Sequence, residues 1–173
     1  ANHSTSPARH PVRALILTPT RELADQVAEN VERYCSTSSL RSTAVYGGID
    51  IRPQKDMLRQ GCELLIATPG RLLDHLEQKN VNLSQVGVLV LDEADRMLDM
   101  GFMPDLERIV NYLPKQRQNL LFSATFSPEI RKLARTILVN PVEITVASNN
   151  QTADTVTQLV YQVGERDKKA ALL

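Results

Sequence analysis

Two short strings of this sequence place hydroxyl, proline and arginine residues directly after an apolar run. They read Thr18-Pro19-Thr20-Arg21-Glu22-Leu23-Ala24 and Thr68-Pro69-Gly70-Arg71. Each would open a helix, and a helix N-terminus offers N–H groups and a positive dipole end to an anion. Arg71 in a first turn opposes that dipole, and a bound phosphate would remove the conflict. For the first string, ordinary capping by Thr18 or Thr20, with Pro19 stiffening the entry and Glu22 matching the dipole, is the structural alternative.

Adjacent carboxylates follow the most apolar run of the chain. Val88-Leu89-Val90-Leu91 leads into Asp92-Glu93-Ala94-Asp95, which matches the Walker B arrangement of P-loop enzymes. There an aspartate holds Mg²⁺ on nucleotide phosphates, and a neighbouring glutamate can orient the attacking water. An acidic cluster that stabilises a helix starting near Ala94 explains the same residues. On these residues alone, both interpretations stand.

Small residues follow two further strands. Gly47 and Gly48 allow a tight turn and the close approach of another backbone, although a simple turn explains them equally well. Ser123-Ala124-Thr125 could cap the next helix or bond the carboxylates of a neighbouring strand. His75 has no partner in the sequence, and we interpret it as structural or exposed.

The elements that must position these residues alternate regularly between strand and helix. Strands are predicted at 13–18, 42–46, 64–67, 86–91 and 119–122, with an edge strand at 142–146; helices at 23–34, 51–59, 71–78, 106–113 and 130–138. Such alternation predicts βαβ units, that is, an α/β fold with a parallel sheet covered by helices on both faces. Ligands of such sheets bind outside the carboxyl ends of the strands, where the strings above lie.

Composition narrows the class of protein. The chain has 173 residues, 42% of them hydrophobic, and its 20 basic and 20 acidic residues cancel. This excludes a wholly disordered or collagen-like chain, and no apolar run reaches the ~20 residues of a membrane span. Cys35 and Cys62 are far apart, so we expect reduced thiols in a cytoplasmic protein. Because the net charge is zero, the chain as a whole does not attract a polyanion, and any nucleic-acid site must be a local group of residues.

Taken in order, these strings resemble the motif series of DEAD-box ATP-dependent RNA helicases. The resemblance covers nearly all of residues 12–173, and Asp92 to Phe102 is especially typical. Phe122 to Ile130 is similar to the bacterial RhlE-type branch. The resemblance implies a RecA-like sheet in which Asp92 holds Mg²⁺ through water, Glu93 serves the hydrolytic water, and Asp95 bonds Ser123 and Thr125 to couple nucleotide state to strand separation. It implies an RNA-backbone site made of Pro19, Thr20, Arg21, Glu22, Gly47, Gly48, Thr68, Pro69, Gly70 and Arg71.

Several parts of the family pattern are absent from the sequence. No glycine is followed by lysine, so there is no P-loop, and the upstream glutamine motif and the second RecA-like domain are missing. We therefore expect a fragment of the first RecA-like domain, truncated before its P-loop strand. Residues 1–11 would be a loop, 12–147 the partial domain, and 148–173 a linker, a last strand at 158–163 and a helix start at 165–173. The missing strand predicts a weakened sheet edge beside 88–91 and self-association.

The resemblance also implies cofactors and partners. The parent protein would use ATP and Mg²⁺ to unwind short RNA duplexes or remodel RNA–protein complexes, with ribosome-assembly or RNA-decay factors as possible partners and no membrane. The fragment alone is predicted not to hydrolyse ATP. Two alternatives remain open: a non-catalytic RNA-binding or protein-interaction module with this fold, and a fragment of a related DNA helicase.

Overall fold

The computed structural model describes residues 9–145 of the chain. Residues 9–139 form one compact unit, and residues 140–145, which belong to a second unit, form neither helix nor strand. The elements, in chain order, are β1 (Ala14–Leu17), α1 (Arg21–Cys35), β2 (Ser42–Val45), α2 (Ile51–Gln60), β3 (Leu64–Ala67), α3 (Pro69–Glu77), β4 (Val88–Leu91), α4 (Ala94–Asp99), α5 (Met103–Asn111), β5 (Gln118–Leu121) and α6 (Pro128–Ile137).

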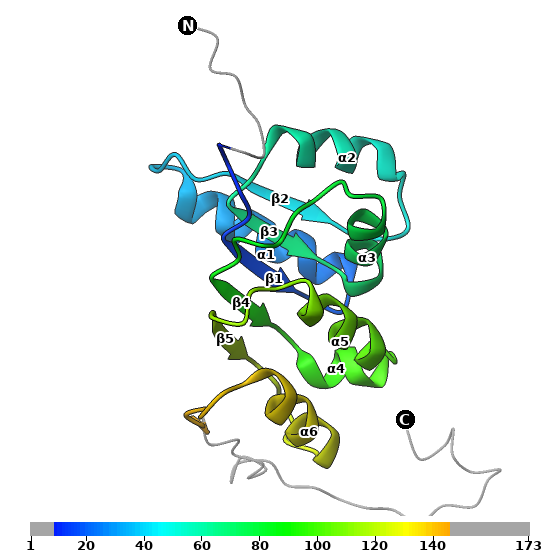
Figure 1. The fold of residues 1–173 in the computed structure, drawn as a ribbon, viewed down its shortest axis with the longest axis vertical. Helices are drawn as coiled ribbons and strands as arrows, with labels where there is room; N and C mark the ends of the chain where they lie inside the picture. Colours follow the sequence, from blue (N-terminus) through cyan, green and yellow to red (C-terminus); the bar gives the residue numbers. More distant parts are fainter. Residues whose placement is uncertain (1–8, 146–173) are drawn as a thin grey trace, which may run out of the picture. The chain divides into compact units, whose positions relative to one another are not determined.

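The strands form one parallel, five-stranded sheet in the order β2-β3-β1-β4-β5 (Figure 1). The strands are in register, with Leu17 opposite both Ala67 and Leu91. Consequently the carboxyl ends of all five strands meet at one edge of the sheet, as the predicted βαβ units require.

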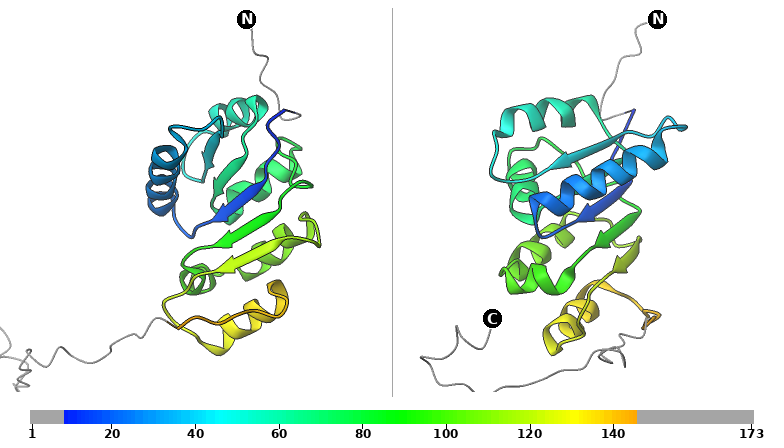
Figure 2. Two further views of the ribbon diagram at one scale, coloured as in Figure 1. Left: turned by 90° about the vertical axis from the view of Figure 1, so that its left-hand side faces the viewer. Right: turned by 180° about the vertical axis from the view of Figure 1, so that it is seen from behind.

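Helices cover both faces of the sheet, as predicted. Helix α1 packs against one face, and α3 and α5 lie on the other (Figure 2). Within the described residues, alternate positions of β1 and β4 belong to one buried apolar cluster with the inner faces of α3 and α5. Its strand members are Leu15, Leu17, Leu89 and Leu91, and its helix members include Leu72, Leu76, Leu106 and Ile109. None of the helices formed by residues 9–145 has the length and apolar character needed to span a bilayer.

The expected weak edge beside residues 88–91 is wrong. Strand β4 is hydrogen-bonded on both sides, to β1 and to β5, so the sheet closes without a gap. The outermost strands of the described sheet are β2 and β5, and Leu120 of β5 is exposed. An edge strand leaves one row of N–H and C=O groups unpaired, so the prediction of self-association now attaches to β5.

Several boundaries differ from the predictions: helices α1, α5 and α6 begin two or three residues before their predicted starts, and two further differences concern α3 and residues 142–145. Helix α3 begins at Pro69, two residues before the predicted start, because proline suits the first turn of a helix. The edge strand predicted at 142–146 is wrong for residues 142–145, which carry no strand and are exposed. The strand predicted at 158–163, the helix start at 165–173 and the domain boundary at 147 lie outside the described residues.

Candidate functional site at the carboxyl ends of the strands

The loops after β1, β2 and β3 lie side by side because parallel pairing continues past the strand ends. The Thr18 amide donates to the Ala67 carbonyl (3.0 Å), and the Thr68 amide donates to the Val45 carbonyl (3.1 Å). The sequence strings 18–24, 47–48 and 68–71, which are separate in the chain, therefore share one edge of the sheet.

The loop after β1 opens helix α1 with capping residues, as its sequence suggested. Thr20 is the N-cap, and its hydroxyl accepts from the Leu23 amide at 3.3 Å. Pro19 is buried, whereas Arg21 and Glu22 are exposed. The Arg21 guanidinium lies over the ring of Tyr46, 5.3 Å from its centroid, so a cation sits between the first and second loops.

The loop after β2 contains the pair of adjacent glycines, which no other part of the described structure covers. Gly47 and Gly48 are both exposed, and a Cβ placed on either would meet no atom within 4 Å. Gly48 has a φ of +81°, a left-handed conformation that other residues adopt only with strain. The turn therefore needs a glycine at 48, and the open space above both residues allows another backbone to approach.

The loop after β3 carries the deepest cation of this edge. The Arg71 side chain is only 11% exposed and its Nε lies 3.5 Å from the Asp74 carboxylate. Its Nη2 donates to the Ile49 carbonyl at 2.9 Å, while Nε and Nη1 are buried with no hydrogen-bond partner among the described residues. The Asp74 carboxylate and the Ile49 carbonyl thus offset part of the unfavourable interaction between the Arg71 cation and the helix dipole. The Nε and Nη1 groups of Arg71 remain able to donate to a ligand.

Within residues 9–145, the rest of the third loop forms an uncapped helix start, in which Thr68 is 8% exposed. Thr68 is the N-cap of α3, but among the described residues its side chain makes no capping hydrogen bond. Pro69 is buried, and Gly70 has open space where a side chain would stand. A hydroxyl and a bare helix start next to Arg71 suit a phosphate oxygen.

Sequence reasoning missed Gln54, which supports this edge from helix α2. The side chain is 1% exposed, and it bonds both the amide of Tyr46 (3.2 Å) and the carbonyl of Tyr46 (3.0 Å). His75 is also fully buried, with Nε2 3.3 Å from Gln54 Oε1, in line with its structural interpretation. The available signal was a glutamine four residues before Leu58, on the core-facing side of an amphipathic helix.

The carboxylates after β4 sit on a strained turn. Glu93 adopts φ +49° and ψ +52°, a left-handed conformation that is uncommon for a residue with a side chain. Its amide donates to Asp92 Oδ1 (3.0 Å), and its carboxylate lies 3.5 Å from Arg96. Strain of this kind persists where the surroundings enforce it, and it often marks a functional position.

Asp95 connects the loops after β4 and β5. Its Oδ2 accepts from both the amide (3.0 Å) and the hydroxyl (3.1 Å) of Thr125. Burial alone would raise the pKa of Asp95, but these hydrogen bonds outweigh it and hold the pKa below its ordinary value. The expected bond from Ser123 to Asp95 is absent within the described residues: Ser123 donates instead to the Thr125 carbonyl (2.7 Å), because its hydroxyl turns inward within its own loop.

The described residues fit one side of a magnesium–nucleotide site. They contain no group of three or more potential metal-ligating side chains, and Asp92 Oδ1 already accepts a hydrogen bond. Mg²⁺ commonly keeps several waters and takes one or two carboxylates plus phosphate oxygens, so Asp92 suits it as a single ligand. No P-loop is present in the sequence to hold those phosphates.

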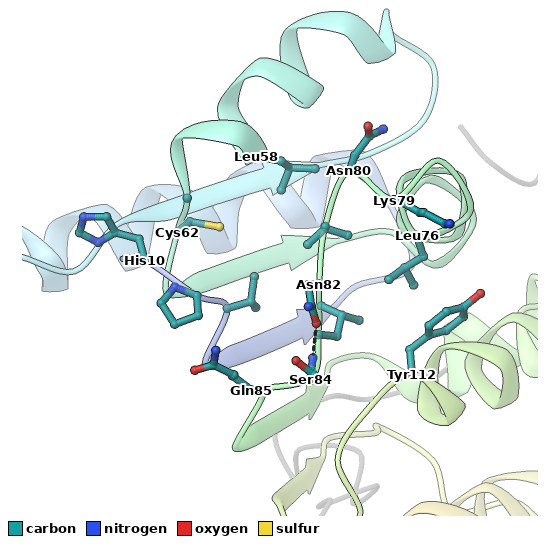
Figure 3. Close-up of a pocket in the computed structure, with 15 residues that line it drawn as sticks. His10, Leu58, Cys62, Leu76, Lys79, Asn80, Asn82, Ser84, Gln85 and Tyr112 are labelled. Atoms are coloured by element: carbon teal, nitrogen blue, oxygen red, sulfur yellow. Dashed lines mark hydrogen bonds between the residues drawn. The ribbon is translucent and has the colours of Figure 1, made fainter. Parts of the chain in front are cut away.

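A cavity lies at the opposite edge of the sheet, away from these residues. It has a volume of about 590 Å³ and is lined by Leu58, Cys62, Leu76 and Tyr112, among others (Figure 3). Burial raises the pKa of the Cys62 thiol to about 11, so this thiol is protonated at neutral pH. Cys62 is therefore not an activated nucleophile in this cavity.

Comparison with known proteins assigns this arrangement to a family. The family model "DEAD/DEAH box helicase" matches residues 2–133, which is more than half of the chain, and the chain belongs to this family. It is 42% identical over 164 residues to the DEAD-box ATP-dependent RNA helicase RhpA of Helicobacter pylori, covering 95% of this chain and 33% of RhpA. It is 46% identical over 169 residues to the ATP-dependent RNA helicase DBP2 of Eremothecium gossypii, covering 97% of this chain and 30% of DBP2.

A solved structure shares the fold. A DEAD box protein from the hyperthermophile Methanococcus jannaschii superposes with a TM-score of 0.71 at 44% sequence identity, covering 75% of this chain and 35% of that one. The parallel sheet with its helices is thus a RecA-like fold of this family. The chain spans about a third of the length of these relatives, so it corresponds to only part of such a protein.

Proposed function

We propose that this chain is the part of an ATP-dependent RNA helicase that contacts the RNA backbone and orients the metal and the hydrolytic water. The observation that carries the proposal is that Thr20, Gly48 and Arg71 meet at one edge of the sheet, with Asp92 and Glu93 at the end of the neighbouring strand. The relatives RhpA and DBP2 are named ATP-dependent RNA helicases, which supports this reading.

RNA would lie across the loops after β1, β2 and β3. The two helix starts at Thr20 and Thr68 suit phosphate oxygens, and the exposed glycine pair lets the sugar–phosphate backbone come close. Contacts of this kind read the form of RNA more than its sequence. The contact residues would be Pro19, Thr20, Arg21, Glu22, Gly47, Gly48, Thr68, Pro69, Gly70 and Arg71.

The loops after β4 and β5 would serve the nucleotide. Asp92 would hold Mg²⁺ through water, Glu93 would orient the attacking water, and the Asp95–Thr125 contact would couple this site to movement of the loop that contains Ser123. When bound, Mg²⁺ would neutralise charge developing on the phosphates of ATP. Since the sequence has no P-loop, we expect this chain alone not to hydrolyse ATP. Turnover above background that disappears in Glu93→Gln would contradict this.

The experiment that tests RNA contact is a salt series with a single-stranded oligouridine and the DNA oligomer of matched length. We expect weak, sequence-tolerant binding that falls with salt, because phosphate contacts release counterions. Arg21→Ala should weaken binding and reduce the salt slope by about 1. Arg33→Ala, at the far end of the same helix, is the matched control.

Two outcomes of that series would overturn the proposal. If neither added salt nor Arg21→Ala weakens oligouridine binding, the chain does not bind RNA through the carboxyl edge of the sheet. Equal or tighter binding of the DNA oligomer would favour the related DNA helicases.

The branch and the cellular setting are further parts of the proposal. The string Phe122 to Ile130 supports an RhlE-type bacterial helicase, while the bacterial and fungal relatives are similarly close at 42% and 46% identity. Reduced cysteines support a cytoplasmic site of action, with ribosome-assembly or RNA-decay factors as partners. Sequencing the parent gene, and co-purifying its product with RNA, would test both.

A further inference from the structure

The loop that carries the glycine pair is held at both ends and free in the middle. We call residues 46–49 the glycine loop. Gln54 bonds its first residue, Tyr46, and Arg71 bonds the carbonyl of its last, Ile49, at 2.9 Å. Between these anchors Gly47 and Gly48 are exposed, and a Cβ added to either would meet no atom within 4 Å.

The Gln54 amide acts on Tyr46 as a neighbouring strand would. Its Oε1 accepts from the Tyr46 amide (3.2 Å) while its Nε2 donates to the Tyr46 carbonyl (3.0 Å). Reversing the amide would place donor against donor and acceptor against acceptor, so the pair of bonds determines one orientation. Gln54 is 1% exposed, and water therefore cannot replace it easily.

His75 extends this contact into helix α3. Because Gln54 Oε1 can only accept, the bond at 3.3 Å requires a proton on His75 Nε2. The other ring nitrogen, Nδ1, is then free to accept from Asn80 Nδ2 at 3.2 Å. The neutral Nε2–H form satisfies both partners, and burial together with the nearby Arg71 cation lowers the pKa of His75 and keeps it neutral.

We infer that Gln54 and His75 are positioning residues for RNA binding, which hold the glycine loop in the conformation that presents the Gly47 and Gly48 backbone to RNA. This inference rests on the proposed function. Two adjacent glycines have more backbone freedom than any other pair, and that freedom would have to be lost when RNA binds. Anchoring the loop in advance removes part of this cost, so the buried amide raises RNA affinity without touching RNA.

The test compares two substitutions on the same helix in the 173-residue chain. Gln54→Met keeps the volume and removes both bonds to Tyr46, whereas Leu58→Met, one turn further along α2, is buried in the core and is not bonded to the loop. We expect Gln54→Met to weaken oligouridine binding about tenfold and to speed amide exchange in residues 46–48. Leu58→Met should change neither the oligouridine affinity nor the amide exchange of residues 46–48, even if it lowers the stability of the chain.

A pair of substitutions at His75 gives a second, independent arm. His75→Leu removes the donor to Gln54 and should weaken RNA binding in the same direction, by a smaller factor. His75→Gln offers an Nε2–H group at a similar reach and should restore most of the affinity. This arm also decides the question if Gln54→Met fails to fold.

The outcomes separate this inference from the function on which it rests. If the wild-type chain does not bind oligouridine, the proposed function is overturned, and with it the role of Gln54 and His75 in RNA binding. Wild-type binding that is unchanged in both Gln54→Met and His75→Leu overturns the inference alone. Equal losses in Gln54→Met and Leu58→Met, or no recovery in His75→Gln, would show that Gln54 and His75 support only the core.

Discussion

The two halves of the carboxyl edge differ in how the chain holds their residues. In the half after β1, β2 and β3, two largely buried side chains hold the loop after β2: Gln54 is bonded to Tyr46, and Arg71 is bonded to Ile49. In the half after β4 and β5, Asp92 and Glu93 are partly exposed, and Phe122 is 54% exposed. We call these the clamped half and the open half.

Strand order does not explain the difference, because each half includes one edge strand, β2 or β5. The difference follows from the side chains that neighbouring helices supply. Gln54 of α2 and Arg71 of α3 are both bonded to the loop after β2, whereas the loops after β4 and β5 are joined to each other by the partly exposed Asp95–Thr125 contact. The proposed RNA contacts are therefore preformed in this chain, and the proposed catalytic residues are held mainly by local backbone geometry.

The largest expected effect compares two leucines in one row of the sheet. Leu17 and Leu121 both lie opposite Leu91, but Leu17 is fully buried and Leu121 only partly so. Leu17→Ala should lower the free energy of unfolding by about 3–5 kcal/mol, and Leu121→Ala by about 1–2 kcal/mol. Urea denaturation measures both. Similar losses would show that the two halves are equally well packed.

The next effect concerns the strained turn of the open half. Since glycine adopts a positive φ freely, Glu93→Gly should leave the chain more stable than Glu93→Ala by about 1 kcal/mol. Thermal and urea unfolding of the two variants give this difference directly. If the alanine variant were the more stable one, position 93 would not hold a left-handed conformation in solution.

The contact between Asp95 and Thr125, which joins the two loops of the open half, should contribute less to stability than the effects above. Thr125→Val removes the hydroxyl bond to Asp95 and keeps the amide bond. A double-mutant cycle with Asp95→Asn should yield a coupling of about 0.5–1 kcal/mol, because the pair is partly exposed. Additive losses in the cycle would mean that Asp95 and Thr125 do not interact in solution.

The smallest effect depends on pH and lies at the opposite edge of the sheet, just before strands β1, β2 and β3 begin. Burial alone would raise the pKa of Glu63, but the Arg41 amide (2.9 Å) and His10 (2.6 Å) outweigh it and hold the pKa below its ordinary value of 4.5. A carboxyl with a lowered pKa stabilises the folded state above the unfolded-state value, and this is lost as pH falls through the folded pKa.

Acid titration of stability measures this contribution. The free energy of unfolding of the wild-type chain should fall more between pH of about 6 and about 3 than that of Glu63→Gln, which has no carboxyl at this position. Parallel curves for the two proteins would show that Glu63 titrates alike in both states.

Much of the fold could be predicted from local sequence pattern. Apolar runs placed the strands, helical spacing placed the helices, and their alternation predicted the parallel sheet. The candidate site could be predicted as well, because loops after parallel strands must share one edge. Thr20, for example, was predicted as a possible cap, and in the structure it caps α1.

What the tertiary structure decided is the pairing between distant segments. Nothing in the string 88–91 shows that β4 lies between β1 and β5, and the expected weak edge was therefore misplaced. The Gln54–Tyr46 and Gln54–His75 contacts join residues 8 and 21 positions apart, and Ser123 turned to its own loop instead of Asp95. Periodicity reports which face of an element is apolar, whereas the partner of a buried polar group depends on which elements the folded chain brings together.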